Sequence, residues 1–248
     1  MVQTQQGPRA RYREQTRSEI KETALRQLAE DGAGALALTR VAKEMGLSGP
    51  ALYRYFAGRD DLLSALIRDA YDDAAAAIAA AADTATGPTE ASAAAAPGPR
   101  ARLHALAGAY RAWAVAEPHR YLLVQGAPVP GYTAPQDTLV RARAVLGPFL
   151  PLFVAGTPGA GVLPVVRQLT DWLRTDTAVA EWVATYAPGA AGDPEASGRA
   201  AGGAVLAWTQ LHGAVSLEVT GQFAGMGHSG ETLLAAQTDM LADAFALD

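Results

Sequence analysis

Apolar residues recur every three or four positions along most of this chain, which is the spacing of one face of an α-helix. Ile20, Ala24, Leu25 and Leu28 form one such stripe, and Gly32 follows it as a helix-ending glycine. No segment shows the sustained alternation that is typical of a half-buried strand. The pattern therefore predicts an all-α fold, with long helices at about 11–30, 60–82, 100–116, 118–125, 135–153, 162–186, 194–223 and 230–247.

Between the first two of these helices, residues 38–56 have the pattern of two short helices joined by a tight turn. Val41, Ala42 and Met45 share one face at helical spacing. Gly46 stands where the chain must turn sharply, because glycine reaches left-handed backbone angles without a Cβ clash. This arrangement is typical of a helix-turn-helix that docks in the major groove of DNA.

Side-chain caps are predicted at the start of both short helices, because a hydroxyl oxygen can accept a hydrogen bond from an unpaired backbone N–H. Thr39 is expected to cap the first helix and Ser48 the second, where Pro50 costs no hydrogen bond in the first turn. The residues left facing outward combine small side chains with a phenol and a guanidinium, which suits close approach to a duplex: Gly49, Ala51, Tyr53 and Arg54.

Charge is unevenly distributed along the chain, although the formal total is −5. Residues 1–59 hold ten of the 20 Lys and Arg residues and six of the 25 Asp and Glu residues, a net charge of +4. Residues 60–248 hold the other ten basic and 19 acidic residues, a net charge of −9. A basic N-terminal module is what phosphate binding requires, because neutralising phosphates releases counterions.

These motifs together resemble a known DNA-binding domain. Residues 13–71 resemble the N-terminal domain of the TetR family of transcriptional repressors, with a glycine-containing turn at 29–34 and an apolar lead-in at 36–38. The recognition helix of that family ends in a Leu-Tyr-x-x-Phe pattern, which is found here at 52–56 and is followed by the basic residue Arg59.

The remainder of the chain resembles a regulatory domain that some TetR-like proteins carry. Its Trp-x-x-x-His-Gly signature is found at 208–213, and the segments 117–121 and 126–131 also fit. The resemblance implies a homodimer that represses transcription from a palindromic operator and is released by a small-molecule effector. No cofactor or metal is expected.

The resemblance also assigns roles at the predicted DNA interface. Tyr53, Thr39 and Arg59 are expected to contact phosphates, and Arg9 and Arg11 to reach an adjacent minor groove as a flexible arm. Bases are expected nearest the start of the recognition helix and Arg54. The full set of predicted DNA-binding residues is Thr39, Arg40, Ser48, Gly49, Pro50, Ala51, Tyr53, Arg54 and Arg59.

Two domains are expected, a DNA-binding domain at 1–71 and a larger helical ligand-binding and dimerisation domain at 72–248. The helix at 60–82 would connect them. Residues 84–99 are rich in Gly, Pro, Ser and Ala and are interpreted as a flexible loop. The proline-rich segment 127–135 is interpreted as a rigid loop that shapes the larger domain.

Several large aromatic side chains are set among the apolar helices of the larger domain, and for each of them taken singly core packing is the better explanation. Together they could line a mostly apolar pocket with a few polar anchors, and the resemblance implies a small-molecule effector. The predicted ligand-binding residues are Tyr110, Trp113, Tyr121, Trp172, Trp208 and His212.

The last two predicted helices carry little charge and have broad apolar faces. Val205, Val215 and Val219 step along one helix at packing intervals, and Leu233 and Met240 do so on the next. Such a seam is either intrachain core or, as the resemblance implies, half of a four-helix dimer interface. Dimerisation would also extend the short DNA sequence that one recognition helix can read.

Other classes of protein have weaker support. The four histidines show no metal-ligand spacing, and the absence of cysteine excludes a thiolate nucleophile and a cysteine zinc site. The alternatives are a helical small-molecule-binding protein or enzyme without a DNA-dependent role, and an architectural DNA binder, which would need basic charge over much of its surface. Without a run of 18 apolar residues, no membrane partner is expected and the protein is predicted to be cytoplasmic.

Overall fold

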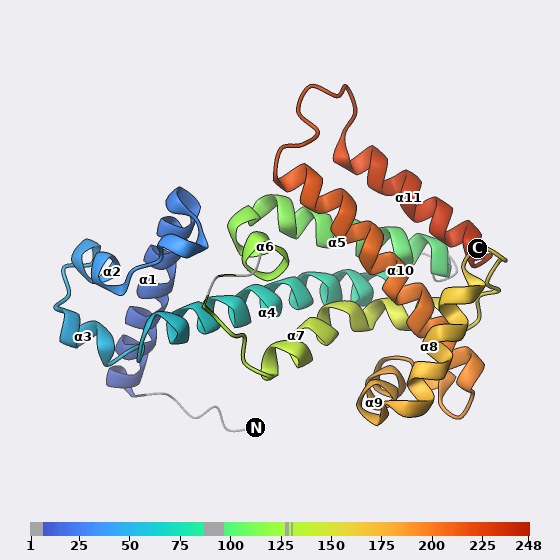
Figure 1. Cartoon of the computed structure of the whole chain (residues 1–248), viewed down its shortest axis with the longest axis horizontal. Helices are drawn as coiled ribbons and strands as arrows, with labels where there is room; N and C mark the ends of the chain where they lie inside the picture. The colour runs from blue at the N-terminus through green and yellow to red at the C-terminus, as the bar shows by residue number, and fades with distance from the viewer. Residues whose placement is uncertain (1–6, 87–96, 127–128, 130) are drawn as a thin grey trace. The chain divides into compact units, whose positions relative to one another are not determined.

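The structure, a computed structural model, describes residues 7–86, 97–126, 129 and 131–248 (Figure 1). This part of the chain is helical and contains no strand, which confirms the predicted all-α fold. None of its helices has the length and apolar character needed to cross a membrane. The α-helices are α1 (Pro8–Asp31), α2 (Leu38–Glu44), α3 (Gly49–Tyr53), α4 (Arg59–Thr86), α5 (Pro99–Ala116), α6 (Pro118–Gln125), α7 (Asp137–Leu146), α8 (Leu163–Thr175), α9 (Thr177–Tyr186), α10 (Pro194–Val219) and α11 (Gly230–Ala244), and the 3₁₀ helices are η1 (Ala33–Ala35), η2 (Gly147–Phe153) and η3 (Pro188–Ala190).

Tertiary contacts divide the chain into two compact units. The first contains the described residues of 1–70 and 119–138, and the second contains those of 71–118 and 139–248. Helix α4 contributes its beginning to the first unit and the rest of its length to the second. The predicted larger domain, 72–248, includes residues 119–138. By tertiary contacts these residues are grouped with the smaller unit, so the two divisions of the chain differ at this segment.

The first unit has its core between α1 and the α2–α3 pair. Helix α1 packs against η1 and α2, and α2 packs against α3. Ile20, Leu52 and Phe56 are fully buried in this unit. Gly32 ends α1 as predicted, with a positive φ of 78° and its N–H 2.9 Å from the carbonyl oxygen of Leu28. The buried apolar stripe of α1 therefore provides the surface on which the short helices are positioned.

The second unit is organised around α10, which packs against α8, η2, α5 and α11. Small residues allow this close packing, because a Cβ atom on Gly203 would lie 2.1 Å from the ring of Phe153. A Cβ atom on Gly198 would similarly lie 1.8 Å from Oγ1 of Thr170. Phe153 also meets Phe245 edge to face, with ring centroids 4.9 Å apart. The glycines of α10 thus serve packing within the chain.

Two predicted helices are interrupted in the structure. The expected helix at 162–186 breaks at Asp176, whose backbone is extended and whose carboxylate accepts a hydrogen bond from the N–H of Val179 at 3.0 Å. Asp176 therefore begins a new helix, α9, instead of continuing α8. The expected helix at 135–153 ends after α7, and the chain continues as η2, which contains Pro151. Proline lacks the N–H that a continuing α-helix needs.

Other predicted helix ends shift by a few residues. Helix α1 begins at Pro8 instead of Arg11, α10 ends at Val219 instead of Phe223, and α11 ends at Ala244 instead of Leu247. Helix α4 extends through 84–86, which were expected to lie in a loop. The rest of the expected flexible loop lies mostly outside the described residues, as do three positions of the expected rigid loop at 127–135.

Candidate nucleic-acid interface

Residues 38–56 form the predicted helix-turn-helix, with α2 and α3 joined by a glycine turn. Gly46 has a left-handed φ of 64°, and nothing lies within 4 Å of where its Cβ atom would be. Glycine is therefore required here by the backbone angle and not by lack of space. The N–H of Leu47 donates to the carbonyl oxygen of Ala42 at 2.8 Å and closes the turn. This turn directs α3 away from the axis of α2.

The two predicted caps have different outcomes. Ser48 is the N-cap of α3, and its Oγ accepts a hydrogen bond from the N–H of Ala51 at 3.3 Å, which confirms the prediction. The prediction for Thr39 is wrong, because the N-cap of α2 is Ala37, two residues earlier, and it makes no side-chain cap hydrogen bond. Thr39 is an exposed residue inside the first turn of α2. Its hydroxyl is consequently not committed to capping.

The outward face of α3 carries the side chains that the sequence predicted. Tyr53 is 55% exposed, and Arg54 and Pro50 are also exposed. Gly49 and Ala51 are half-buried. The apolar positions of the same segment point into the unit, so α3 presents a surface of small residues, one phenol and one guanidinium.

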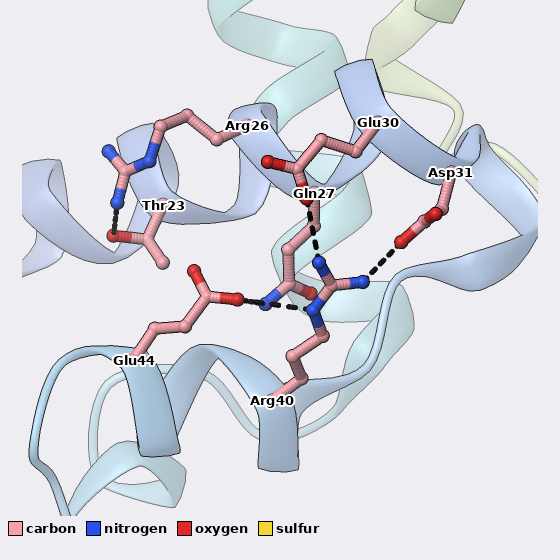
Figure 2. A network of polar contacts seen from close by, with 7 residues as sticks. All are labelled: Thr23, Arg26, Gln27, Glu30, Asp31, Arg40 and Glu44. Atoms are coloured by element: carbon pink, nitrogen blue, oxygen red, sulfur yellow. Dashed lines mark hydrogen bonds and ion pairs between the residues drawn. The ribbon is translucent and has the colours of Figure 1, made fainter.

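Arg40 lies in a network of ion pairs within the first unit (Figure 2). Its guanidinium pairs with Glu30 at 2.7 Å, with Glu44 at 3.1 Å and with Asp31. Gln27 extends the network by donating to Glu44 at 3.0 Å. The hydrogen bond that Arg40 donates to Asp31 is the main cause of the raised pKa of Arg40. Three carboxylates compensate this positive charge, and a DNA phosphate would have to compete with them.

The other predicted basic contacts are also positioned by the fold. Arg59 donates through Nε to the carbonyl oxygen of Leu36 at 3.1 Å and pairs with Asp60 at 3.4 Å. Arg59 therefore ties the start of α4 to the segment before α2. The prediction of a flexible arm at Arg9 and Arg11 is wrong, because both residues lie in the first turns of α1.

A basic hollow, which the sequence analysis did not identify, lies beside the end of α3. It encloses about 520 Å³ and is lined by Arg9, Tyr12, Arg13, Arg54 and Tyr55. Nη2 of Arg13 donates to the carbonyl oxygen of Arg54 at 3.5 Å, which joins the two helices at this point. The signal that could have revealed it is the four-residue spacing of Arg9 and Arg13, which places both on one face of α1.

Four of the six predicted ligand-binding residues form an aromatic cluster in the second unit. The ring centroid of Tyr110 lies 5.8 Å from that of Trp113 and 6.0 Å from that of Trp208. The ring of Trp208 stacks on His212, with centroids 6.2 Å apart. Tyr110 and Trp113 are buried on α5, whereas Trp208 and His212 are half-buried on α10. The cluster thus extends from the core toward the surface of α10.

The other two predicted ligand-binding residues lie elsewhere. Trp172 is on α8, with its side chain 46% exposed. Tyr121 is fully buried on α6, which is grouped with the first unit. The aromatic character of Trp172 and Tyr121 could not show that they lie outside the cluster, because helix packing decides which rings become neighbours.

The comparisons with known proteins agree with this geometry. A family model described as "Tetracyclin repressor-like, C-terminal domain" matches residues 103–241, and one described as "Bacterial regulatory proteins, tetR family" matches residues 20–66. The first match alone spans more than half of the chain. The chain belongs to the TetR family. It is therefore a DNA-binding transcriptional regulator, in a family where dimerisation, ligand response and a repressor role are typical.

Relatives of this TetR-family regulator match over nearly their whole length. HTH-type transcriptional regulators Rv1816 of Mycobacterium tuberculosis and Mb1846 of Mycobacterium bovis are each 34% identical over 238 residues, which cover 95% of this chain and 94% of the relative. The crystal structure of a regulatory protein, SCO4313, is 40% identical, covers 96% of this chain and 100% of its own, and has a TM-score of 0.74. A TetR-family protein from Rhodococcus RHA1, 16% identical with a TM-score of 0.56, shares the fold over 92% of this chain and 96% of its own.

Proposed function

We propose that this regulator is a homodimeric repressor that binds a pseudo-palindromic operator and is released from it by an apolar small molecule. The observation that carries the DNA-binding part is the exposed face of α3, where Tyr53 and Arg54 stand beside small residues on a capped helix. Repression, effector release and the two-domain division at 1–71 and 72–248 are supported by what is typical of the family. Two recognition helices related by a two-fold axis would match two half-sites one helical turn apart.

In the proposed complex α3 enters the major groove. Gly49, Pro50 and Ala51 lie nearest the bases, because their small side chains allow the helix backbone to approach base edges. The phenol of Tyr53 and the hydroxyl of Thr39 contact phosphates, since both are exposed and able to donate a hydrogen bond. Arg40 and Arg59 support this surface through their contacts within the first unit.

The test is selection of bound duplexes from a random pool by the full-length wild-type protein. We expect enrichment of a pseudo-palindrome. The Gly49→Glu, Tyr53→Ala double variant should bind this duplex roughly 100-fold more weakly or worse, which corresponds to a loss of about 2.8 kcal/mol of binding free energy at 1.4 kcal/mol per factor of ten. Gly34→Glu is the matched control, because it adds the same charge at an exposed glycine outside α3 with nothing within 4 Å of the added Cβ atom. Equal operator affinity in the double variant and the control would refute the assignment of α3.

The proposed effector site is the aromatic cluster of Tyr110, Trp113, Trp208 and His212. It offers large apolar ring faces together with the indole N–H of Trp208 and an imidazole, which suits a mostly apolar molecule with a polar group. Effector binding would shift the population toward a conformation with lower operator affinity. If the wild-type protein enriches no duplex but binds apolar molecules, the alternative of a helical binding protein without a DNA-dependent role is favoured instead.

A further inference from the structure

We propose that Arg9, Arg13 and Arg54 form a binding site for one phosphate of the DNA backbone beside the recognition helix. This inference rests on the proposed function, because it takes α3 as the element that enters the major groove. It assigns Arg54 to the backbone instead of to a base, and it gives the beginning of α1 a direct part in DNA binding.

All three arginines line one hollow of about 520 Å³. Arg9 and Arg13 are four residues apart on α1, so their side chains lie on the same face of the helix about one turn apart. Arg54 is the C-cap of α3 and directly follows the exposed Tyr53. Tyr12 also lines the hollow, is 70% exposed and brings a hydroxyl that can donate to an anion. The hollow therefore holds donors that suit a phosphate.

The charge in the hollow is not compensated within the described part of the chain. There, none of the three arginines is within 4.0 Å of a carboxylate oxygen, whereas Arg40 in the same unit pairs with three carboxylates. Like charges that line one hollow repel one another, and a bound anion relieves the repulsion. An arginine-lined hollow without internal carboxylates is therefore suited to binding an anion.

Contacts between α1 and the end of α3 hold the site in place. Arg13 donates to the carbonyl oxygen of Arg54, and Arg17, one turn further along α1, donates to that of Tyr55. Arg17 also lies 4.2 Å above the ring centroid of Phe56. A guanidinium has five N–H donors, so the single bond from Arg13 leaves its others available. A phosphate of a strand bordering the major groove is the anion expected at the end of a helix that lies in that groove.

The test measures operator affinity by fluorescence polarisation between roughly 50 and 200 mM salt, using the duplex selected by the wild-type protein. The plot of log affinity against log salt has a negative slope, and each lost phosphate contact reduces its steepness by about 0.9. A dimer has two such sites, so the Arg9→Gln, Arg13→Gln variant should reduce the steepness by about 1.8. Arg26→Gln is the control, because Arg26 is exposed and lies later on α1, and it should leave the slope unchanged. Circular dichroism verifies folding, and the Arg9→Lys, Arg13→Lys variant should restore most of the slope.

A second measurement locates the contact on the DNA. Duplexes in which one phosphate at a time is replaced by a neutral methylphosphonate should reveal one position in each half-site that weakens binding of the wild-type protein but not of the Arg9→Gln, Arg13→Gln variant. An unchanged salt slope in that folded variant, or the same methylphosphonate sensitivity in both proteins, overturns this site while leaving the proposed function intact. Failure of the wild-type protein to select any duplex overturns the proposed function and this site with it.

Discussion

Nη2 of Arg40 lies 2.7 Å from Oε2 of Glu30, which joins the first turn of α2 to the end of α1. Asp31 and Glu44 complete the set of carboxylates around the same guanidinium (Figure 2). A single arginine thus connects the last turn of α1 to both ends of α2. Because α3 follows α2 through a tight turn, this connection helps to set the orientation of the recognition helix.

Arg40→Ala is therefore expected to lower thermal stability while leaving the salt slope of operator binding unchanged. The stability falls because three carboxylates lose their partner and then repel one another. Thermal unfolding followed by circular dichroism measures the first effect, and the difference from wild type should shrink at high salt, where exposed charges are screened. Arg26→Ala is the control. A salt slope lowered as in a phosphate-contact variant would show instead that Arg40 contacts DNA.

On the two final helices, a glutamate is expected to have different effects at an exposed and at a buried position. Met240 on α11 is 68% exposed, whereas Val215 on α10 is fully buried within the second unit. Met240→Glu should give folded monomers, because it places charges in the proposed dimer interface. Val215→Glu should instead reduce helicity, since an unpaired buried charge costs about 3–5 kcal/mol. Analytical ultracentrifugation and circular dichroism measure these outcomes.

Thr185→Glu, at an exposed position on α9, is the matched control for the dimer prediction and should remain dimeric. A folded dimer in the Met240→Glu variant would place the interface elsewhere. This result would leave the buried role of Val215 unaffected, because that role depends on contacts within one chain.

Substitution within the aromatic cluster should separate effector response from operator binding. Trp208→Phe retains an apolar ring but removes the indole N–H and some contact area, so an effector bound there should lose affinity. A coupling free energy of about 1–3 kcal/mol between effector and operator binding corresponds to a 5- to 150-fold change in operator affinity. The variant should need a higher effector concentration than wild type to release the operator. Trp172→Phe is the control, since its ring is exposed on α8. Identical effector titrations of operator release in wild type and Trp208→Phe would contradict this site.

Gly203 and Gly108 form a matched pair for the packing of the second unit. Gly203→Ala should destabilise the protein by about 1–3 kcal/mol, because the new methyl group would overlap the ring of Phe153. Gly108 is exposed on α5 with nothing within 4 Å, so Gly108→Ala should stabilise by about 0.5–1 kcal/mol through helix propensity. Chemical denaturation measures both. If both substitutions changed the free energy of unfolding equally and in the same direction, close packing against Phe153 would not be the reason for a glycine at 203.

The lowered pKa of Asp239 predicts that the folding stability of the protein depends on pH. Hydrogen bonds from His104 and Arg100 lower the pKa of Asp239 below its ordinary value of 3.8, and these bonds join α11 to α5. Because the pKa is lower in the folded state, the stabilisation is fully present above pH 3.8 and is lost as the pH falls through the lower, folded value. The difference in melting temperature between wild type and Asp239→Asn should therefore shrink below pH 3.8. A difference that grows on acidification would contradict this assignment.

The sequence by itself determined the fold class, the order of the helix-turn-helix and the cap at Ser48. These features depend on local physics: helical periodicity, the backbone freedom of Gly46 and a hydroxyl next to an unpaired N–H. The exposed face of α3 could also be read from the sequence, because Leu52 and Phe56 lie four residues apart on the buried side, which leaves Tyr53 and Arg54 pointing outward.

Tertiary structure alone decided which charges and rings meet. The sequence alone gives no reason to treat Arg40 and Arg54 differently, yet Arg40 pairs with two carboxylates from α1 and one from α2, whereas Arg54 lies in an arginine-lined hollow. Each of these environments includes residues of α1 that are nine or more positions away in the sequence. Trp208 and Trp172 were equally good candidates, and only helix packing placed Trp208 against Tyr110. Contacts between distant segments depend on how apolar faces pack, and periodicity along one helix does not specify its neighbour.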